Sequence, residues 1–222
     1  MNNTTINLEK FVAAWEKLLE EHPNNFLLYF MPDLFIEELP NDVSVLPHNM
    51  EYWYKEEELQ KDGKRAHHQV YTKNNRGEKV TIYMRIQFVP QPNLPRMMFD
   101  YYGRTFCEYD NSHPTLFVFH AYDNVPERND VFEIYSEFSP DPEKPKLHFS
   151  FGSSKIADYS KEELLNSENP FAFAVLGSQF LKDSTNDPHL RKQYKEKLTI
   201  LLEQKSYSAS QKKSLGAILD LF

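Results

Sequence analysis

Few residues in this chain have side chains and spacings suited to catalysis or metal binding. There is one cysteine, Cys107, and the eight histidines are scattered, so no zinc-site spacing can be drawn. His67 and His68 are adjacent in a segment that reads as a strand, where successive side chains point to opposite faces. They would therefore not bind one metal ion together. The glycines are isolated rather than grouped in a phosphate-binding loop, and no serine nucleophile elbow occurs.

The clearest organisation lies in residues 65–109. Residues 66–73 and 79–89 show the alternating apolar and polar side chains of strands, on either side of a turn that ends at Gly77. A segment with several prolines follows, and the aromatic spacing then predicts a buried helix over 95–109. The sequence thus predicts a central unit of strand, turn, strand and helix.

This unit lacks the carboxylates that Mg²⁺-dependent hydrolysis needs. On the second strand, Gln87 and Val89 share a face with Arg85. Neither 65–73 nor 79–98 contains an acidic residue. Because Mg²⁺ requires anionic oxygen ligands to offset its dehydration, we expect no metal and no cofactor here.

The rest of the chain predicts helices at both ends and further strands between them. Helices are expected over 6–21, 25–37, 169–182 and 186–204, with a last helix that starts near Ser208 or Ser210. Further strands are expected over 115–121, 131–138 and 147–151. These elements predict an α/β fold with a core over 1–158 and a helical C-terminal region over 159–222.

Five residues have local structural expectations of their own. Asn7 is a candidate N-cap, and Ser160 and Glu163 have the spacing of a capping box. His120, beside an apolar run, is expected to be a core histidine with its hydrogen bonds satisfied. Cys107, between Phe106 and Glu108, is expected to be a small buried helix residue rather than a nucleophile.

The charge of the chain argues against nucleic acid as a direct partner. The net charge is −8, so the chain should bind duplex DNA weakly by itself. Residues 108–143 contain nine acids and one base. Such a concentration of acidic residues is typical of a surface exposed to solvent. The alternative is a contact surface for a basic protein. The candidate residues for that surface are Asp123, Glu127, Asp130, Glu133 and Glu137.

The sequence also indicates a compartment. A single cysteine fits a reducing cytosol, the N-terminus lacks the pattern of a signal peptide, and no apolar run reaches membrane-spanning length. We therefore expect a cytoplasmic protein without membrane contact.

Several segments in a fixed order resemble one known family. They are residues 95–101 (PRMMFDY), residues 114–123 (PTLFVFHAYD), and residues 165–170 (LNSENP) followed by Ala172 and Ala174. In these segments the chain is similar to the recombination-promoting nuclease and transposase family, a branch of the PD-(D/E)XK nucleases. The resemblance covers about residues 25–222. It implies a restriction-endonuclease-like core, in which a mixed central sheet is flanked by helices.

The resemblance also implies where catalytic residues would stand. Family members carry Asp on the first strand and Glu-x-Gln or Glu-x-Lys on the second. Counting from the turn at Gly77 puts His68, Gln87 and Val89 at these positions. The resemblance therefore implies a nuclease frame without its catalytic acids.

Three functions are compatible with this sequence. The first is a catalytically inactive nuclease-fold subunit that acts through protein contacts, in a bacterial complex directed against foreign DNA such as phage or plasmid. The second is an active metal-dependent endonuclease that uses other acids, for example Asp33, Glu37 or Asp100. The third is a regulator that binds DNA without cutting it, which the negative charge disfavours.

Overall fold

The structure is a computed structural model that describes residues 7–32, 65–73, 79–108, 114–122, 125, 130–135 and 143–222. The helices are α1 (Leu8–Glu21), α2 (Pro23–Phe30), α4 (Leu94–Glu108), the 3-10 helix η1 (Ile156–Asp158), α5 (Lys161–Asn166), α6 (Pro170–Asp183), α7 (Pro188–Gln204) and α8 (Ala209–Leu219). The strands are β1 (Arg65–Lys73), β2 (Lys79–Gln87), β3 (Thr115–His120), β4 (Val131–Ile134), β5 (Leu147–Ser150) and β6 (Gly152–Lys155). Within these ranges, no helix is long and apolar enough to cross a bilayer.

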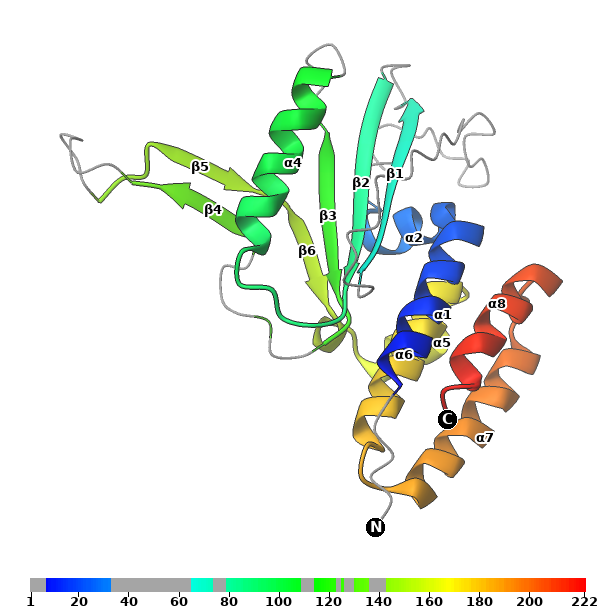
Figure 1. The fold of residues 1–222 in the computed structure, drawn as a ribbon. Coiled ribbons are helices and arrows are strands. Elements are labelled where there is room, and N and C mark those ends of the chain that lie inside the picture. The colour runs from blue at the N-terminus through cyan, green and yellow to red at the C-terminus, as the bar shows by residue number, and fades with distance from the viewer. Residues whose placement is uncertain are drawn as a thin grey trace.

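A four-stranded mixed sheet forms the centre of the molecule, in the order β1-β2-β3-β6 (Figure 1). β1 and β2 are antiparallel, whereas β2, β3 and β6 are parallel. Parallel neighbours cannot be joined by a tight turn, so the chain crosses from β2 to β3 through α4. The carboxyl ends of β2, β3 and β6 consequently lie together at the lower end of the sheet in Figure 1.

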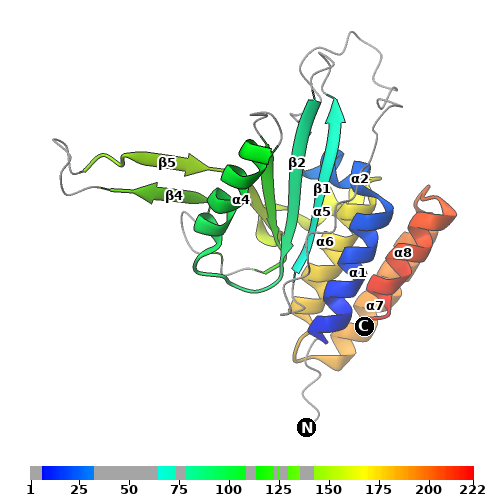
Figure 2. The ribbon, with the colours of Figure 1, turned by 45° about the horizontal axis from the view of Figure 1, so that its top comes forward.

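Alternation along β2 gives the sheet two apolar faces. Ile82, Met84 and Ile86 belong to the core that α1, α2 and α6 complete, on the right of Figure 2. Tyr83 belongs to a second cluster on the α4 side, where its ring centroid lies 4.0 Å from that of Tyr101. Because both faces are covered, β3 is buried almost throughout, as expected for a central parallel strand.

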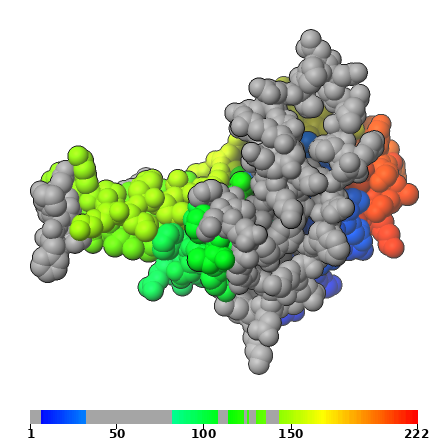
Figure 3. All heavy atoms as spheres, turned by 90° about the horizontal axis from the view of Figure 1, so that it is seen from above, coloured from blue at the N-terminus to red at the C-terminus, as the bar shows by residue number. Residues whose placement is uncertain are grey.

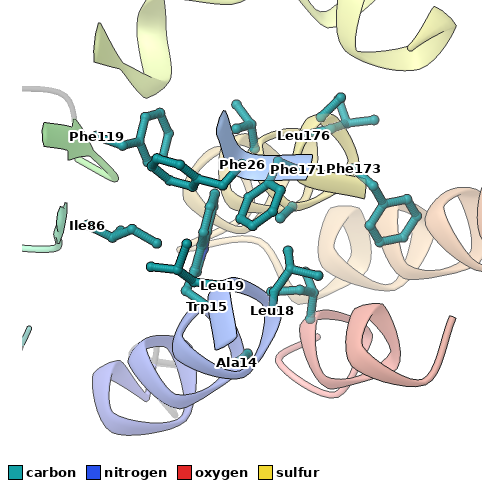
Figure 4. Packing of buried hydrophobic residues seen from close by; sticks show 14 of the residues in the cluster. Ala14, Trp15, Leu18, Leu19, Phe26, Ile86, Phe119, Phe171, Phe173 and Leu176 are labelled. Carbon is teal, nitrogen blue, oxygen red and sulfur yellow. The ribbon is translucent and has the colours of Figure 1, made fainter. Parts of the chain in front are cut away.

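The main core is aromatic and joins the two ends of the chain. Trp15 of α1 packs against Phe119 of β3 and Phe171 of α6, with ring centroids 5.3 and 6.1 Å apart (Figure 4). The indole nitrogen of Trp15 donates to the Ser178 hydroxyl at 3.2 Å, so its one polar atom is satisfied. α1 and α6 therefore cover the same face of the sheet through this cluster.

A two-stranded ribbon of β4 and β5 extends away from the body, on the left of Figures 1 and 3. Its base rests on α4, because Phe99 packs against Phe132 and Phe149 with centroids 5.2 and 5.4 Å apart. Farther out, Ile134 and Tyr135 are 44% and 51% exposed. The ribbon thus has a supported base and an uncovered outer part among the described residues.

The helices agree closely with the sequence expectations. Asn7 caps α1 through its side chain, which accepts from the Lys10 amide at 3.1 Å. Ser160 and Glu163 form the expected capping box at the start of α5. The last helix begins after Ser208, which also forms a capping box. The expected mixed α/β architecture, with a central sheet and flanking helices, is confirmed.

Two expected strands have different bounds in the structure. The strand expected over 131–138 ends at Ile134, and Tyr135 is already irregular. The strand expected over 147–151 is β5, one residue shorter, and a further strand that was not expected, β6, follows it after Phe151. The Phe151 amide donates to the Asp130 carbonyl at 3.1 Å, and the chain then moves from the ribbon to the edge of the main sheet.

The helix expected over 25–37 also differs. α2 begins earlier, at Pro23, because proline at the first helical position needs no amide donor. It ends at Phe30, and the expected continuation beyond Pro32 lies outside the described residues. The helix α4 was expected to be buried, but Phe99, Tyr102 and Phe106 are each partly exposed.

Candidate functional site

Gln87 and Val89 stand at the carboxyl end of β2. Gln87 is the last residue of the strand and is 1% exposed, and Arg85 beside it is 3% exposed. The Arg85 Nε donates to the Gln87 Oε1 at 2.9 Å, and the Gln87 Nε2 donates to the Val89 carbonyl at 2.7 Å. The Gln87 side chain is therefore held at both its oxygen and its nitrogen by neighbouring groups.

The same arginine links the strand to the following helix. A terminal nitrogen of Arg85 donates to the Gln91 Oε1 at 3.1 Å, and the Gln91 amide donates to the Asn93 Oδ1 at 3.2 Å. Gln91 and Asn93 immediately precede α4. The network fixes the crossover between β2 and α4 at the end of the sheet where ligands of parallel sheets commonly bind.

This arrangement is unsuited to a divalent cation. The Gln87 Oε1 already accepts from the buried guanidinium of Arg85. A positive charge at that distance repels a second cation strongly in a low-dielectric setting. Within the described ranges, no group of three or more His, Cys, Asp or Glu side chains could hold a metal ion.

The backbone of His68 does not lie opposite Gln87. In the register of β1 and β2, His68 is paired with Met84, and Gln87 is paired with Arg65. Three residues along a strand correspond to about 10 Å. Gln87 and Val89 are thus neighbours in the structure, whereas His68 occupies a separate position on the adjacent strand.

His120 lies next to Gln87 on the central strand. In the register of the parallel strands, Gln87 is paired with His120, and His120 is paired with Lys155 of β6. His120 is 1% exposed, so its expected place in the core is confirmed. The expectation that its hydrogen bonds are satisfied was wrong, because neither ring nitrogen has a partner among the described residues.

Charged groups surround this histidine. Burial lowers the pKa of His120 to about 4, and the nearby Arg85 and Lys155 also lower it, although Asp130 and Asp158 oppose the shift. The imidazole is therefore neutral at pH 7. Tyr122, two residues on, has its ring centroid 5.4 Å from that of His120, and its buried hydroxyl also lacks a partner in the described part of the chain.

The candidate acidic contact residues are only partly placed. The Asp130 carboxylate accepts from the Ser153 hydroxyl at 3.4 Å, beside the main sheet. Glu133 lies on the ribbon, where its carboxylate contacts the His148 Nδ1 at 2.9 Å and accepts from the Tyr135 hydroxyl at 2.8 Å. Asp130 therefore lies beside the main sheet, whereas Glu133 lies on the ribbon. Asp123, Glu127 and Glu137 lie outside the described residues.

The alternative catalytic acids do not form a site in the described ranges. Asp100 is exposed on α4, and Asp33 and Glu37 lie outside those ranges. Cys107 is in α4 as expected, but it is exposed rather than buried. Sequence reasoning missed Tyr122 and Lys155 as neighbours of His120. Alternation along 115–122 would have placed Tyr122 on the face of His120, but Lys155 comes into register only through the β3 and β6 pairing.

Comparisons with protein-family models, with curated proteins and with solved structures gave no match to this chain.

Proposed function

We propose that this chain is a catalytically inactive subunit with a PD-(D/E)XK nuclease-like fold, which acts through contacts with other proteins. Its setting is a bacterial cytoplasmic complex directed against foreign DNA, such as phage or plasmid. The family resemblance in sequence supplies the nuclease-like part of the proposal. The side chains at the carboxyl end of β2 are the reason for proposing that the subunit is catalytically inactive.

The observation that carries the proposal is the pairing of Arg85 with Gln87. A buried guanidinium holds an amide where the resemblance places the metal-binding glutamate. Hydrolysis by this family requires a metal ion to activate water and to stabilise the charge of the transition state. A site with an arginine, an amide and the Val89 carbonyl offers no carboxylate for that ion.

The order of elements supports the nuclease-like part. β1 and β2 form an antiparallel pair, α4 follows, and β3 then adds in parallel to β2. This order of strands and helix agrees with the core that the resemblance implies.

The outer part of the ribbon supports a role in protein contacts. Ile134 and Tyr135 are large apolar side chains that stand 44% and 51% exposed. Aromatic and aliphatic side chains on a projecting element are typical anchors of protein interfaces. β4, one of the two strands of the ribbon, belongs to a stretch, residues 108–143, that contains nine acids and one base. A partner with a basic rim around an apolar pocket fits this composition.

A matched pair of substitutions tests the contact role. Ile134→Asp places a charge on the ribbon, and Ile200→Asp places the same charge on α7, where Ile200 is 55% exposed. Tagged versions of the full chain are purified from the native host, and the co-purified proteins are compared by mass spectrometry. We expect Ile134→Asp to lose partners that both the wild type and Ile200→Asp retain. Equal sets of partners for all three proteins would contradict the contact role of the ribbon.

A further inference from the structure

One side of α4 faces away from both the main sheet and the ribbon. Met98 and Tyr101 pack towards the sheet, and Phe99 packs on the ribbon. On the remaining side, Asp100 and Arg104 are exposed to solvent. Figure 1 shows no other described element in front of this side. We call it the outward face of α4.

The charges on α4 alternate in sign at intervals of four residues. Arg96 and Arg104 are positive, whereas Asp100 and Glu108 are negative. Residues four apart in a helix are close enough for an ion pair. Within the described residues, however, Arg96 and Asp100 form no ion pair, and the Arg104 guanidinium lies over the ring of Tyr101, 6.0 Å from its centroid. The charged groups of the outward face are therefore not neutralised by a neighbour on their own helix.

This charge pattern is complementary to itself when its direction is reversed. In two antiparallel copies of α4 that cross near Gly103, position 100 of one helix comes opposite position 104 of the other, and position 96 comes opposite position 108. Opposite charges then meet on both sides of a two-fold axis, as a contact between identical copies requires. A partner with charge of a single sign could match only half of the pattern.

Gly103 lies between the two central charges, and its own chain does not require a glycine there. A Cβ atom at this position would meet no atom within 4 Å. Glycine inside a helix is less favourable than alanine, so its presence needs another reason. A residue without a side chain allows a second helix to approach the backbone closely, and the crossing point of the two copies is such a place.

We propose that the outward face of α4 is the contact between two copies of this chain in an antiparallel dimer with two-fold symmetry. Asp100 of each copy pairs with Arg104 of the other, and Gly103 lets the two helices approach. The ribbon packs on another side of α4, so this contact goes beyond the proposed function and leaves the ribbon free. Because one pair of helices covers less than the about 1,200 Å² of a stable interface, the dimer should form only above about 10 µM.

Sedimentation equilibrium of the purified full chain tests the contact, at concentrations from about 5 to about 500 µM. About 0.15 M salt screens the repulsion between copies of net charge −8 beyond about 8 Å, whereas charges in direct contact are closer than that. We expect the mass to rise with concentration from the 26.3 kDa of one chain towards twice that value.

Charge reversal then identifies the residues in the contact. Asp100→Arg and Arg104→Asp should each raise the dissociation constant about tenfold or more, because like charges then face each other twice. An equimolar mixture of these two variants should restore the dimer, because each supplies the charges that the other lacks. Lys192→Asp, a matched reversal at an exposed position of α7, should dimerise like the wild type.

A change at the crossing point gives an independent test. Gly103→Leu should weaken the dimer about tenfold or more, because its side chain separates the two helices. It should leave the thermal unfolding of the single chain unimpaired, since the site has room for a side chain and leucine favours a helix.

Three results would overturn this contact. The first is a mass of one chain at every concentration, and the second is single charge reversals that dimerise as tightly as the wild type. The third is a mixture of the two reversals that stays monomeric while the wild type dimerises. If the wild type is monomeric and Asp100→Arg loses a host protein on co-purification, the face belongs to that protein instead. Self-association of the purified chain is measured without partners or DNA, so the proposed function stands or falls separately.

Discussion

Arg85 and Gln87 are buried side chains joined by a hydrogen bond of 2.9 Å. Both lie at the end of β2, and under the proposed function the guanidinium puts positive charge where a catalytic metal would need negative charge. The pair also has a structural role, since Arg85 donates a second hydrogen bond to Gln91, which lies just before α4. Arg85 thereby helps to fix the crossover from β2 to α4.

Replacing this arginine should destabilise the protein. Arg85→Met leaves the Oε1 atoms of Gln87 and Gln91 without their donor, and unsatisfied buried acceptors are costly. We expect the free energy of unfolding to fall by about 2–4 kcal/mol in urea titrations. Arg96→Met on the exposed side of α4 is the matched control and should change it by less than about 0.5 kcal/mol. Equal effects of the two substitutions would contradict a structural role for the Arg85 network.

His120 makes stability depend on pH in a defined window. Its pKa is about 4 in the folded chain and near 6.5 when exposed, so the unfolded chain binds the extra proton between these values. Stability from the neutral ring is therefore complete above pH 6.5 and decreases as the pH falls towards 4. The loss amounts to about 3 kcal/mol. As the pH falls through this window, the wild type should lose about 3 kcal/mol of stability relative to His120→Leu, whichever protein is the more stable at pH 7, and parallel pH profiles would refute this assignment.

At the scale of elements, α4 connects the main sheet to the ribbon. Its inner side packs on the sheet through Tyr101 and Met98, and its outer side meets the ribbon through Phe99. A two-stranded ribbon has little stability by itself. The ribbon therefore depends on this aromatic contact at its base.

Removing the contact should loosen the ribbon without opening the sheet. Phe99→Ala deletes a partly exposed ring that packs on Phe132 and Phe149, at a cost of about 1–3 kcal/mol. We expect faster amide hydrogen exchange in β4 and β5, with unchanged exchange in β2 and β3. Equal acceleration in both sheets would show instead that the ribbon and the main sheet open as one unit.

Local patterns predicted the helices well and the strands less well. α1 and α5 follow from apolar spacing and from caps at Asn7 and Ser160, which act within one helical turn. β6 was missed because its sequence, Gly-Ser-Ser-Lys, has neither β-branched nor aromatic residues. Its strand conformation comes from pairing with β3, a contact between distant segments that no local pattern reveals.

In the candidate site too, local patterns predicted some features and contacts between distant segments determine the others. The alternation of side chains along β2 was enough to place Arg85 and Gln87 on one face, because such alternation is a property of every single strand. The meeting of His120 with Lys155 requires the order of strands in the sheet. The lack of hydrogen-bond partners for His120 depends on three-dimensional packing, and the apolar run around it predicted only its burial.

At the scale of the whole molecule, the helices α6 and α8 of the C-terminal region pack closely on each other. A Cβ atom at Gly177 of α6 would lie 2.7 Å from the Ile218 Cγ2 of α8, whereas one at Gly216 would meet no atom within 4 Å. Gly177→Ala should therefore lower the free energy of unfolding by about 1–3 kcal/mol. Gly216→Ala should raise it by up to about 1 kcal/mol through helix propensity. Thermal unfolding of both variants checks this, and stabilisation by both would mean that α6 and α8 pack less closely.

The central claim is that this chain does not cut DNA, and the most direct test is metal-dependent nicking of supercoiled plasmid by the purified full chain. Calorimetric titration with Mg²⁺ and Mn²⁺ accompanies the assay. We predict no nicking above the metal-free control and no site-specific metal binding, because the position beside Gln87 is filled by the guanidinium of Arg85. Metal-dependent nicking that disappears in folded His68→Ala, Gln87→Ala or Asp100→Asn variants would contradict the claim.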